Sequence, residues 1–135
     1  MRAVIDTNCL IASIPPHSNY YWLYKAFENG KFEWLISNEV LAEYEEILAT
    51  FYSSKTAELV LNILDVAPNV IYTDPFYKWN LIELDSDDNK FVDLALIGNA
   101  DYLVTNDKDF SVLKNIPFPK VNVVNLNEFK IVLNV

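Results

Sequence analysis

Four acidic side chains stand where an α/β chain brings its strand ends together, and their type favours metal chemistry. They are Asp6 in VIDTN, Glu43 in LAEYEEIL, Asp88 in SDDNKF and Asp107 in LVTNDKDF. Because like charges repel, carboxylates that converge need a compensating charge, and a divalent cation with oxygen ligands commonly supplies it. A cation held by carboxylates can activate a water against a phosphodiester bond. We therefore predict a metal-dependent enzyme that acts on phosphodiesters.

Two of these acids follow short apolar segments that have the composition of strands. Residues 3–5 lead into Asp6, and residues 102–105 lead towards Asp107. Further strand candidates are residues 33–36, 70–72 and 121–124. Since parallel strands end at the same edge of a sheet, the acids after them are expected to lie at one edge.

Apolar residues at helical spacing predict helices between these strands. The first has Ser18 as its cap and Gly30 at its end, and the next begins at Ser37 and runs to Phe51. The others cover residues 56–64, the stretch from the 85–89 cap to Gly98, and a closing helix that begins at Asn125 or Asn127. The pattern does not assign residues 75–84. This alternation predicts an α/β fold, a three-layer α/β/α sandwich with a central parallel sheet, as a single domain over residues 1–135.

Helical periodicity leaves two choices open within the acidic set. Glu43 lies at one margin of the apolar stripe of its helix, and Glu45 lies at the other. Asp87 and Asp88 both fall near the inner face of the next acidic helix, so periodicity does not choose between them. The same pattern predicts that Asp93 is a surface residue.

Composition restricts the class of partner. The formal net charge of −9 argues against tight non-specific binding to duplex nucleic acid and suits a basic protein partner. No apolar run approaches the roughly 20 residues of a spanning helix, so we expect a cytoplasmic protein without a membrane partner. The single cysteine, Cys9, is expected to be a buried, reduced thiol, and His17, the only histidine, a loop residue.

Four segments together resemble the PIN-domain family, and more narrowly its bacterial branch of toxin components of toxin–antitoxin systems. They are VIDTNCLIAS, SNEVLAEYEEIL, DDNKFVDLALIGNADYLVTNDKDF and VNVVNLNEF, in the order in which the family has them. The resemblance implies a ribonuclease that uses one or two Mg²⁺ or Mn²⁺ ions and leaves a 5′-phosphate and a 3′-hydroxyl. It also implies an RNA substrate, a small antitoxin protein as partner and a homo-oligomer, either a homodimer or a larger assembly.

The family's four acids fall on Asp6, Glu43, Asp88 and Asp107, which the resemblance makes both catalytic residues and metal ligands. It thereby selects Glu43 over Glu45 and Asp88 over Asp87. Supporting roles next to the ligands or the substrate fall on Thr7, Asn8, Thr105, Lys90 and Lys108, the lysines as contacts to phosphate. Asp109 is either an accessory acid or a helix cap.

Two other interpretations remain open. The alternative function is an RNA- or partner-binding PIN-like module without catalytic activity. A phosphate-transfer enzyme with Asp6 as nucleophile is less favoured, because the second Asp common in that chemistry is replaced by Asn8. The aromatic group at residues 20–24 is expected to pack against the core, with base stacking or subunit contact as the alternative.

Overall fold

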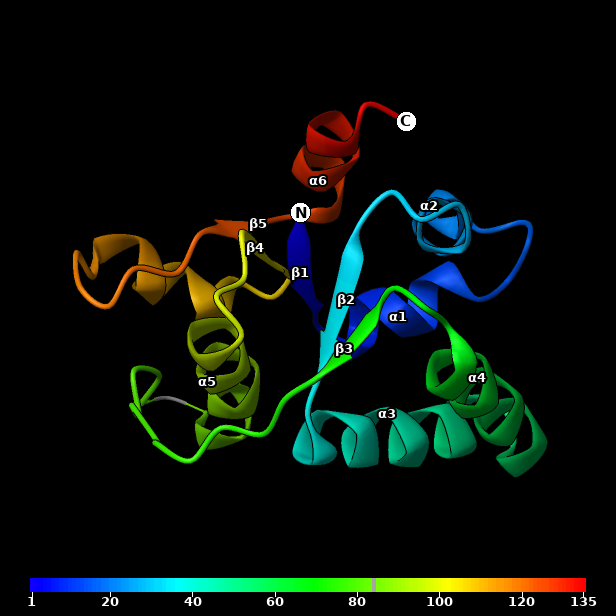
Figure 1. The fold of residues 1–135 in the computed structure, drawn as a ribbon, viewed down its shortest axis with the longest axis horizontal. Coiled ribbons are helices and arrows are strands. Elements are labelled where there is room, and N and C mark those ends of the chain that lie inside the picture. The colour runs from blue at the N-terminus through cyan, green and yellow to red at the C-terminus, as the bar shows by residue number, and fades with distance from the viewer. Residues whose placement is uncertain (84) are drawn as a thin grey trace.

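The computed structural model describes residues 1–83 and 85–135, and a five-stranded parallel sheet forms its centre (Figure 1). The sheet order is β3-β2-β1-β4-β5. The strands are β1 (Arg2–Ile5), β2 (Glu33–Ile36), β3 (Val70–Tyr72), β4 (Tyr102–Val104) and β5 (Val123–Val124). These are the segments that the sequence predicted, apart from differences of one or two residues at their ends.

Helices cover both sides of the sheet, which confirms the predicted α/β sandwich. One side carries α1 (Thr7–Ser13), α2 (Tyr21–Glu28), α3 (Asn38–Phe51) and α4 (Ser54–Val66). The other carries η1 (Ser86–Asp88), α5 (Asn89–Ile97) and η2 (Lys108–Asn115), and α6 (Leu126–Leu133) follows β5. Within the described ranges, no helix combines the length and the apolar character that crossing a membrane requires.

The middle of the sheet is covered on both faces, so its strands are continuously apolar. Ala3, Val4 and Ile5 of β1 have no exposed surface. Ile5 is aligned with Val104 of β4, and the backbone N–H of Asp6 donates to the carbonyl of Val104 at 2.9 Å. The strand pairing therefore places the residues that follow β1 and β4 side by side.

The helix caps show which helix starts the local sequence predicted correctly and which it did not. Ser37 caps α3 by accepting from the backbone of Val40, and Asn125 caps α6 in a reciprocal capping box with Glu128. The predicted cap at Ser18 is wrong, because α2 begins at Tyr21 and the Ser18 hydroxyl donates to the carbonyl of Ala12. The short helices α1 and η2, directly after Asp6 and Asp107, were not predicted.

The prediction that Asp93 is a surface residue is wrong. Its side chain is only 6% exposed, and its carboxylate accepts a hydrogen bond from the backbone N–H of Trp79 at 3.1 Å. Burial raises the pKa of Asp93. The segment around Trp79 covers the face of α5 that periodicity assigned to solvent, which is why pattern alone placed Asp93 on the surface. This segment falls in the 75–84 interval, of which residue 84 lies outside the described residues.

Replacing Asp93 tests this anchor. We expect Asp93→Leu to destabilise the fold by about 1–3 kcal/mol, because it leaves the N–H of Trp79 without its acceptor. Asp93→Asn keeps an acceptor oxygen and removes a buried charge, so its loss should be smaller. Urea unfolding monitored by circular dichroism measures both, and equal stability of the leucine variant and the wild type would show that the anchor contributes nothing.

Candidate metal-binding active site

The carboxyl ends of β1 and β4 form the floor of the candidate site. Asp6 follows β1 and is 6% exposed, and the hydroxyl of Thr105, after β4, donates to its Oδ2 at 2.7 Å. The backbone N–H of Asp107 donates in turn to Thr105 Oγ1 at 3.0 Å. In the sheet order, the strands before α5 extend to one side of β1 and the strands after it extend to the other, so β1 and β4 meet at the switch point where open α/β sheets bind ligands.

Glu43 reaches this floor from α3. The Thr7 hydroxyl donates to Glu43 Oε2, and Lys90 Nζ donates to Oε1 at 2.9 Å as a half-buried ion pair. Glu45, its rival in the sequence pattern, is exposed and faces α4. The structure thus links residues from α1, α3 and α5 through one carboxylate.

Asp88 occupies the opposite side of the cluster, at the end of η1. Its Oδ2 is buried and has no hydrogen-bond partner among the described residues. Carboxylate oxygens of Asp85, Asp88 and Asp109 all lie within 4.8 Å of one another. Sequence reasoning left Asp109 as either an accessory acid or a helix cap and gave Asp85 only a place in the helix cap. Helical periodicity predicts neither position, because Asp85 precedes η1 and Asp109 lies in η2, both short 3₁₀ helices.

Burial and mutual repulsion raise the pKa values of acids in the site. The pKa of Asp6 is raised to about 6, mainly by burial; the charges of Glu43 and Asp107 add to this rise, and the Thr105 hydrogen bond opposes it. Burial raises the pKa of Asp88 to about 7, reinforced by Asp85, Asp107 and Asp6. The predicted acids are therefore near enough to repel one another. A divalent cation would offset both this repulsion and the cost of burying the charges.

The donor set fits a hard divalent cation. Mg²⁺ and Mn²⁺ take oxygen ligands, and the carboxylates of Asp6, Glu43, Asp88 and Asp107 supply them. The buried, unpartnered Oδ2 of Asp88 is the clearest sign of this fit, since a buried carboxylate oxygen without a partner is costly unless a ligand satisfies it.

The other predicted residues differ in how exposed their side chains are. Thr7 is buried against Glu43, whereas Asn8 is exposed on α1 and Lys108 is exposed at the start of η2. Burial raises the pKa of Cys9 to about 12, so this free thiol stays protonated at neutral pH and is not a nucleophile. His17 is exposed in the segment after α1.

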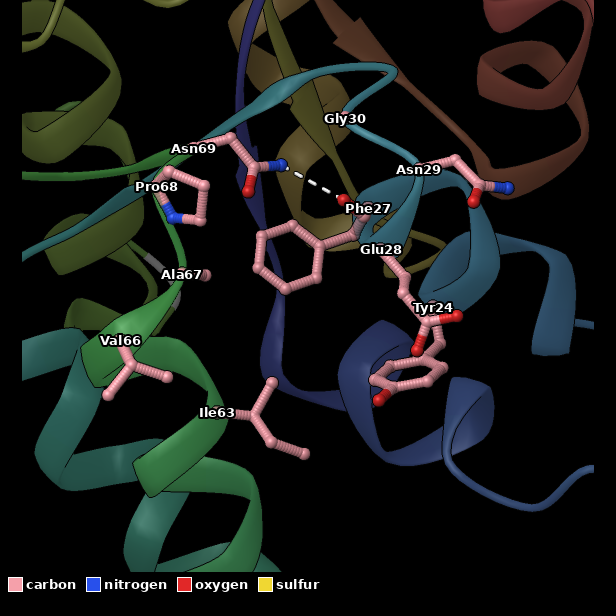
Figure 2. A pocket seen from close by; sticks show the side chains of 10 residues that line it. All are labelled: Tyr24, Phe27, Glu28, Asn29, Gly30, Ile63, Val66, Ala67, Pro68 and Asn69. Atoms are coloured by element: carbon pink, nitrogen blue, oxygen red, sulfur yellow. Dashed lines mark hydrogen bonds between the residues drawn. The ribbon is translucent and has the colours of Figure 1, made fainter.

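An apolar cavity of about 540 Å³ lies away from the acidic residues (Figure 2). It opens between the C-terminal turns of α2 and α4, with Phe27 and Tyr24 on one wall and Ile63 and Val66 on the other. None of the predicted site residues lines it. In the nearby aromatic group, Tyr20 and Trp22 pack against the core, as predicted.

Comparisons with known proteins agree with this architecture. The model of the family described as PIN domain matches residues 2–109. A chain in the crystal structure of VapBC2 from Rickettsia felis, bound to a DNA fragment from its promoter, superimposes with a TM-score of 0.65 at 23% identity, covering 93% of this chain and 98% of that one. A comparison with curated proteins by sequence finds no match.

Two further solved structures share the fold at lower identity. A chain in the crystal structure of FitAcB from Neisseria gonorrhoeae has a TM-score of 0.59 at 16% identity, with 92% of this chain and 97% of that chain covered. A chain of FitAB bound to an IR36 DNA fragment has a TM-score of 0.56 at 14% identity, with 92% and 94% covered.

Proposed function

The chain belongs to the PIN-domain family, and from this premise we propose that it is a Mg²⁺- or Mn²⁺-dependent endoribonuclease and the toxin of a toxin–antitoxin pair. The observation that carries the proposal is the gathering of carboxylates at the ends of β1 and β4, with a buried oxygen of Asp88 left unpartnered among the described residues. A site of this kind suits a cation with a phosphodiester approaching from solvent.

The four acids that the family resemblance selects, together with Thr105, have separate roles under this proposal. Asp6, Asp88 and Asp107 hold the ion or ions, and Glu43 joins them directly or through a water. When bound, the cation polarises the phosphodiester and lowers the pKa of the attacking water. Thr105 orients the carboxylate of Asp6 by its 2.7 Å hydrogen bond. A water that attacks phosphorus in line with the 3′-oxygen breaks the P–O3′ bond, and O3′ leaves as a hydroxyl, so the expected products carry a 5′-phosphate and a 3′-hydroxyl, without any role for the 2′-hydroxyl.

The decisive experiment is a cleavage assay with the purified chain. RNA should be cut in Mg²⁺ or Mn²⁺ and left intact in EDTA, and end-labelling should find 5′-phosphates on the products. If the chain binds RNA or a protein partner tightly but does not cut RNA with either metal, the alternative of a non-catalytic binding module replaces this proposal.

The toxin role is supported by the neighbours in fold. VapBC and FitAB are toxin–antitoxin complexes, and the structures similar to this chain belong to them. The net charge of −9 suits a small basic antitoxin. We expect a homodimer that binds such a partner, and co-expression with the partner should suppress the cleavage seen with the chain alone.

Lys90 provides a smaller test of the metal site. Its ammonium group pairs with Glu43 at 2.9 Å, so it competes with a cation for that carboxylate. Lys90→Met should therefore tighten Mn²⁺ binding about 3- to 10-fold, a charge effect of roughly 1 kcal/mol. Titration of free Mn²⁺ by electron paramagnetic resonance measures it, with Lys55→Met on α4 as the control. Weaker Mn²⁺ binding by Lys90→Met would contradict the competition.

A further inference from the structure

The segment between β3 and η1 carries exposed aromatic side chains. Phe76 is 89% exposed, Tyr77 59% and Trp79 38%. The rings of Tyr77 and Trp79 contact each other, with centroids 4.8 Å apart and planes at 66°. Lys78 lies between them in the sequence. We call residues 74–80 the aromatic loop; it crosses the end of the sheet where α3 and α5 begin (Figure 1).

The aromatic loop is held by the two helices that border the acidic cluster. The backbone N–H and side-chain amide of Asn38, on α3, donate to Asp74 at 2.7 and 2.8 Å. On α5, the buried carboxylate of Asp93 accepts from Trp79. Just beyond the loop, the Asn89 side chain makes two hydrogen bonds with the backbone of Ile82, at 2.9 and 2.8 Å. The backbone of this loop is therefore anchored to the two helices that border the acidic residues.

A polar cavity of about 500 Å³ lies between the aromatic loop and these helices, in the size range of ligand pockets. Its lining includes Glu39, Lys78, Asn80, Asp87, Lys90 and Asp93. Lys90 also bonds Glu43, and Asp87 precedes Asp88 in the chain. Through Lys90, which lines the cavity and bonds Glu43, the cavity borders the candidate active site.

We propose that the aromatic loop is a base-stacking platform, and that the cavity beside it receives an unpaired nucleotide of the RNA strand next to the cleaved bond. This inference rests on the proposed function and adds where the substrate strand lies. Aromatic rings bind the faces of unpaired bases, and bases in single strands are the ones that can be splayed out for recognition.

The chemistry of the cavity favours a base over a bare phosphate or an apolar protein segment. The carboxylates of Glu39 and Asp87 are exposed, would repel a phosphate and can accept hydrogen bonds from the amino groups of a base. Lys78 and Lys90 are placed for the phosphates on either side. An apolar protein partner would leave these charged groups buried without partners, which is costly.

Binding of labelled RNA to the Asp6→Asn protein tests the platform without cleavage. Tyr77→Ala and Trp79→Ala should each weaken binding of a single-stranded RNA about 5- to 150-fold, the range that loss of one stacked base gives. A duplex of the same sequence should bind weakly and lose little. Trp79→Phe should retain most of the affinity, because a ring remains.

Phe51→Ala is the matched control. Phe51 is 66% exposed, like Tyr77, but lies at the far end of α3, roughly 20 Å along the helix from Ser37. It should leave RNA binding unchanged. Thermal melts should show that every variant is folded, and Tyr77→Ala keeps the test valid if Trp79→Ala destabilises the loop.

The outcomes separate the platform from the nuclease activity. If Tyr77→Ala and Trp79→Ala bind single-stranded RNA like the parent, the platform is rejected, whether or not the wild type cuts RNA. If they turn a dimer into a monomer and leave RNA binding unchanged, the loop is a subunit contact and the platform is again rejected. If they weaken binding while the wild type fails to cut RNA, the platform stands and the proposed activity falls.

Discussion

Replacing Asp6 with Asn should lower metal-dependent RNA cleavage by at least about 100-fold, since loss even of a residue that only supports a metal ligand costs about 10- to 100-fold. The amide keeps the size of the side chain and can still accept the hydroxyl of Thr105, so the floor of the site is preserved. What is lost is the negative charge beside Asp107 and Glu43, the acids whose charges act on Asp6.

The control for this experiment is Asp65→Asn, an identical change at an exposed position on α4. It should cut RNA at the wild-type rate. Initial rates at saturating Mg²⁺ and Mn²⁺ should be measured for both variants on one RNA. Cleavage by Asp6→Asn at the control's rate would exclude Asp6 from the catalytic metal site and would leave the acids of the cluster without their proposed role.

The metal-free protein should be stabilised by the same substitution at neutral pH. Burial and neighbouring acids raise the pKa of Asp6 from 3.8 to about 6, so the folded state keeps a proton that the unfolded chain has already released. Stability therefore falls as pH rises from about 4 to about 6, and the loss persists above that range. Asn has no charge to bury, so Asp6→Asn should be more stable than the wild type by roughly 2–3 kcal/mol at pH 7.5.

Urea unfolding in EDTA at pH 4, 5, 6 and 7.5 measures this effect. The difference between Asp6→Asn and the wild type should shrink as pH falls and be lost near pH 4, whereas Asp65→Asn should match the wild type throughout. Added Mg²⁺ should stabilise the wild type and not the Asp6 variant, because a ligand stabilises only the state that binds it. If Asp6→Asn is less stable than the wild type at pH 7.5, the buried charge of Asp6 does not destabilise the folded protein.

The two predictions together separate catalysis from folding. A residue selected for packing loses stability when it is replaced, whereas a residue kept for function at a cost in stability gains it. Because the pKa of Asp88 is raised to about 7, replacing Asp88 with Asn should also stabilise the metal-free protein at neutral pH. An inactive but more stable Asp6→Asn protein would therefore assign the acidic cluster to function.

Much of the fold followed from local signals in the sequence. Continuous apolar runs predicted β1 and β4 because both faces of a central parallel strand are covered. Ser37 and Asn125 cap their helices by bonds to residues three positions on, a local interaction that a sequence displays. Elements without such signals, such as the short helices α1 and η2, were missed.

The sequence by itself also determined which acids follow strand ends, and the family resemblance chose Glu43 and Asp88 from their rivals. Only the tertiary structure decided what surrounds them: the link from Thr7 through Glu43 to Lys90, the place of Asp85 and Asp109 beside Asp88, and the burial of Asp93 beneath the aromatic loop. The physical reason is the distance along the sequence over which each interaction acts. Alternation and capping depend on neighbours a few residues away, whereas these contacts depend on strand pairing and on irregular segments that no periodicity describes.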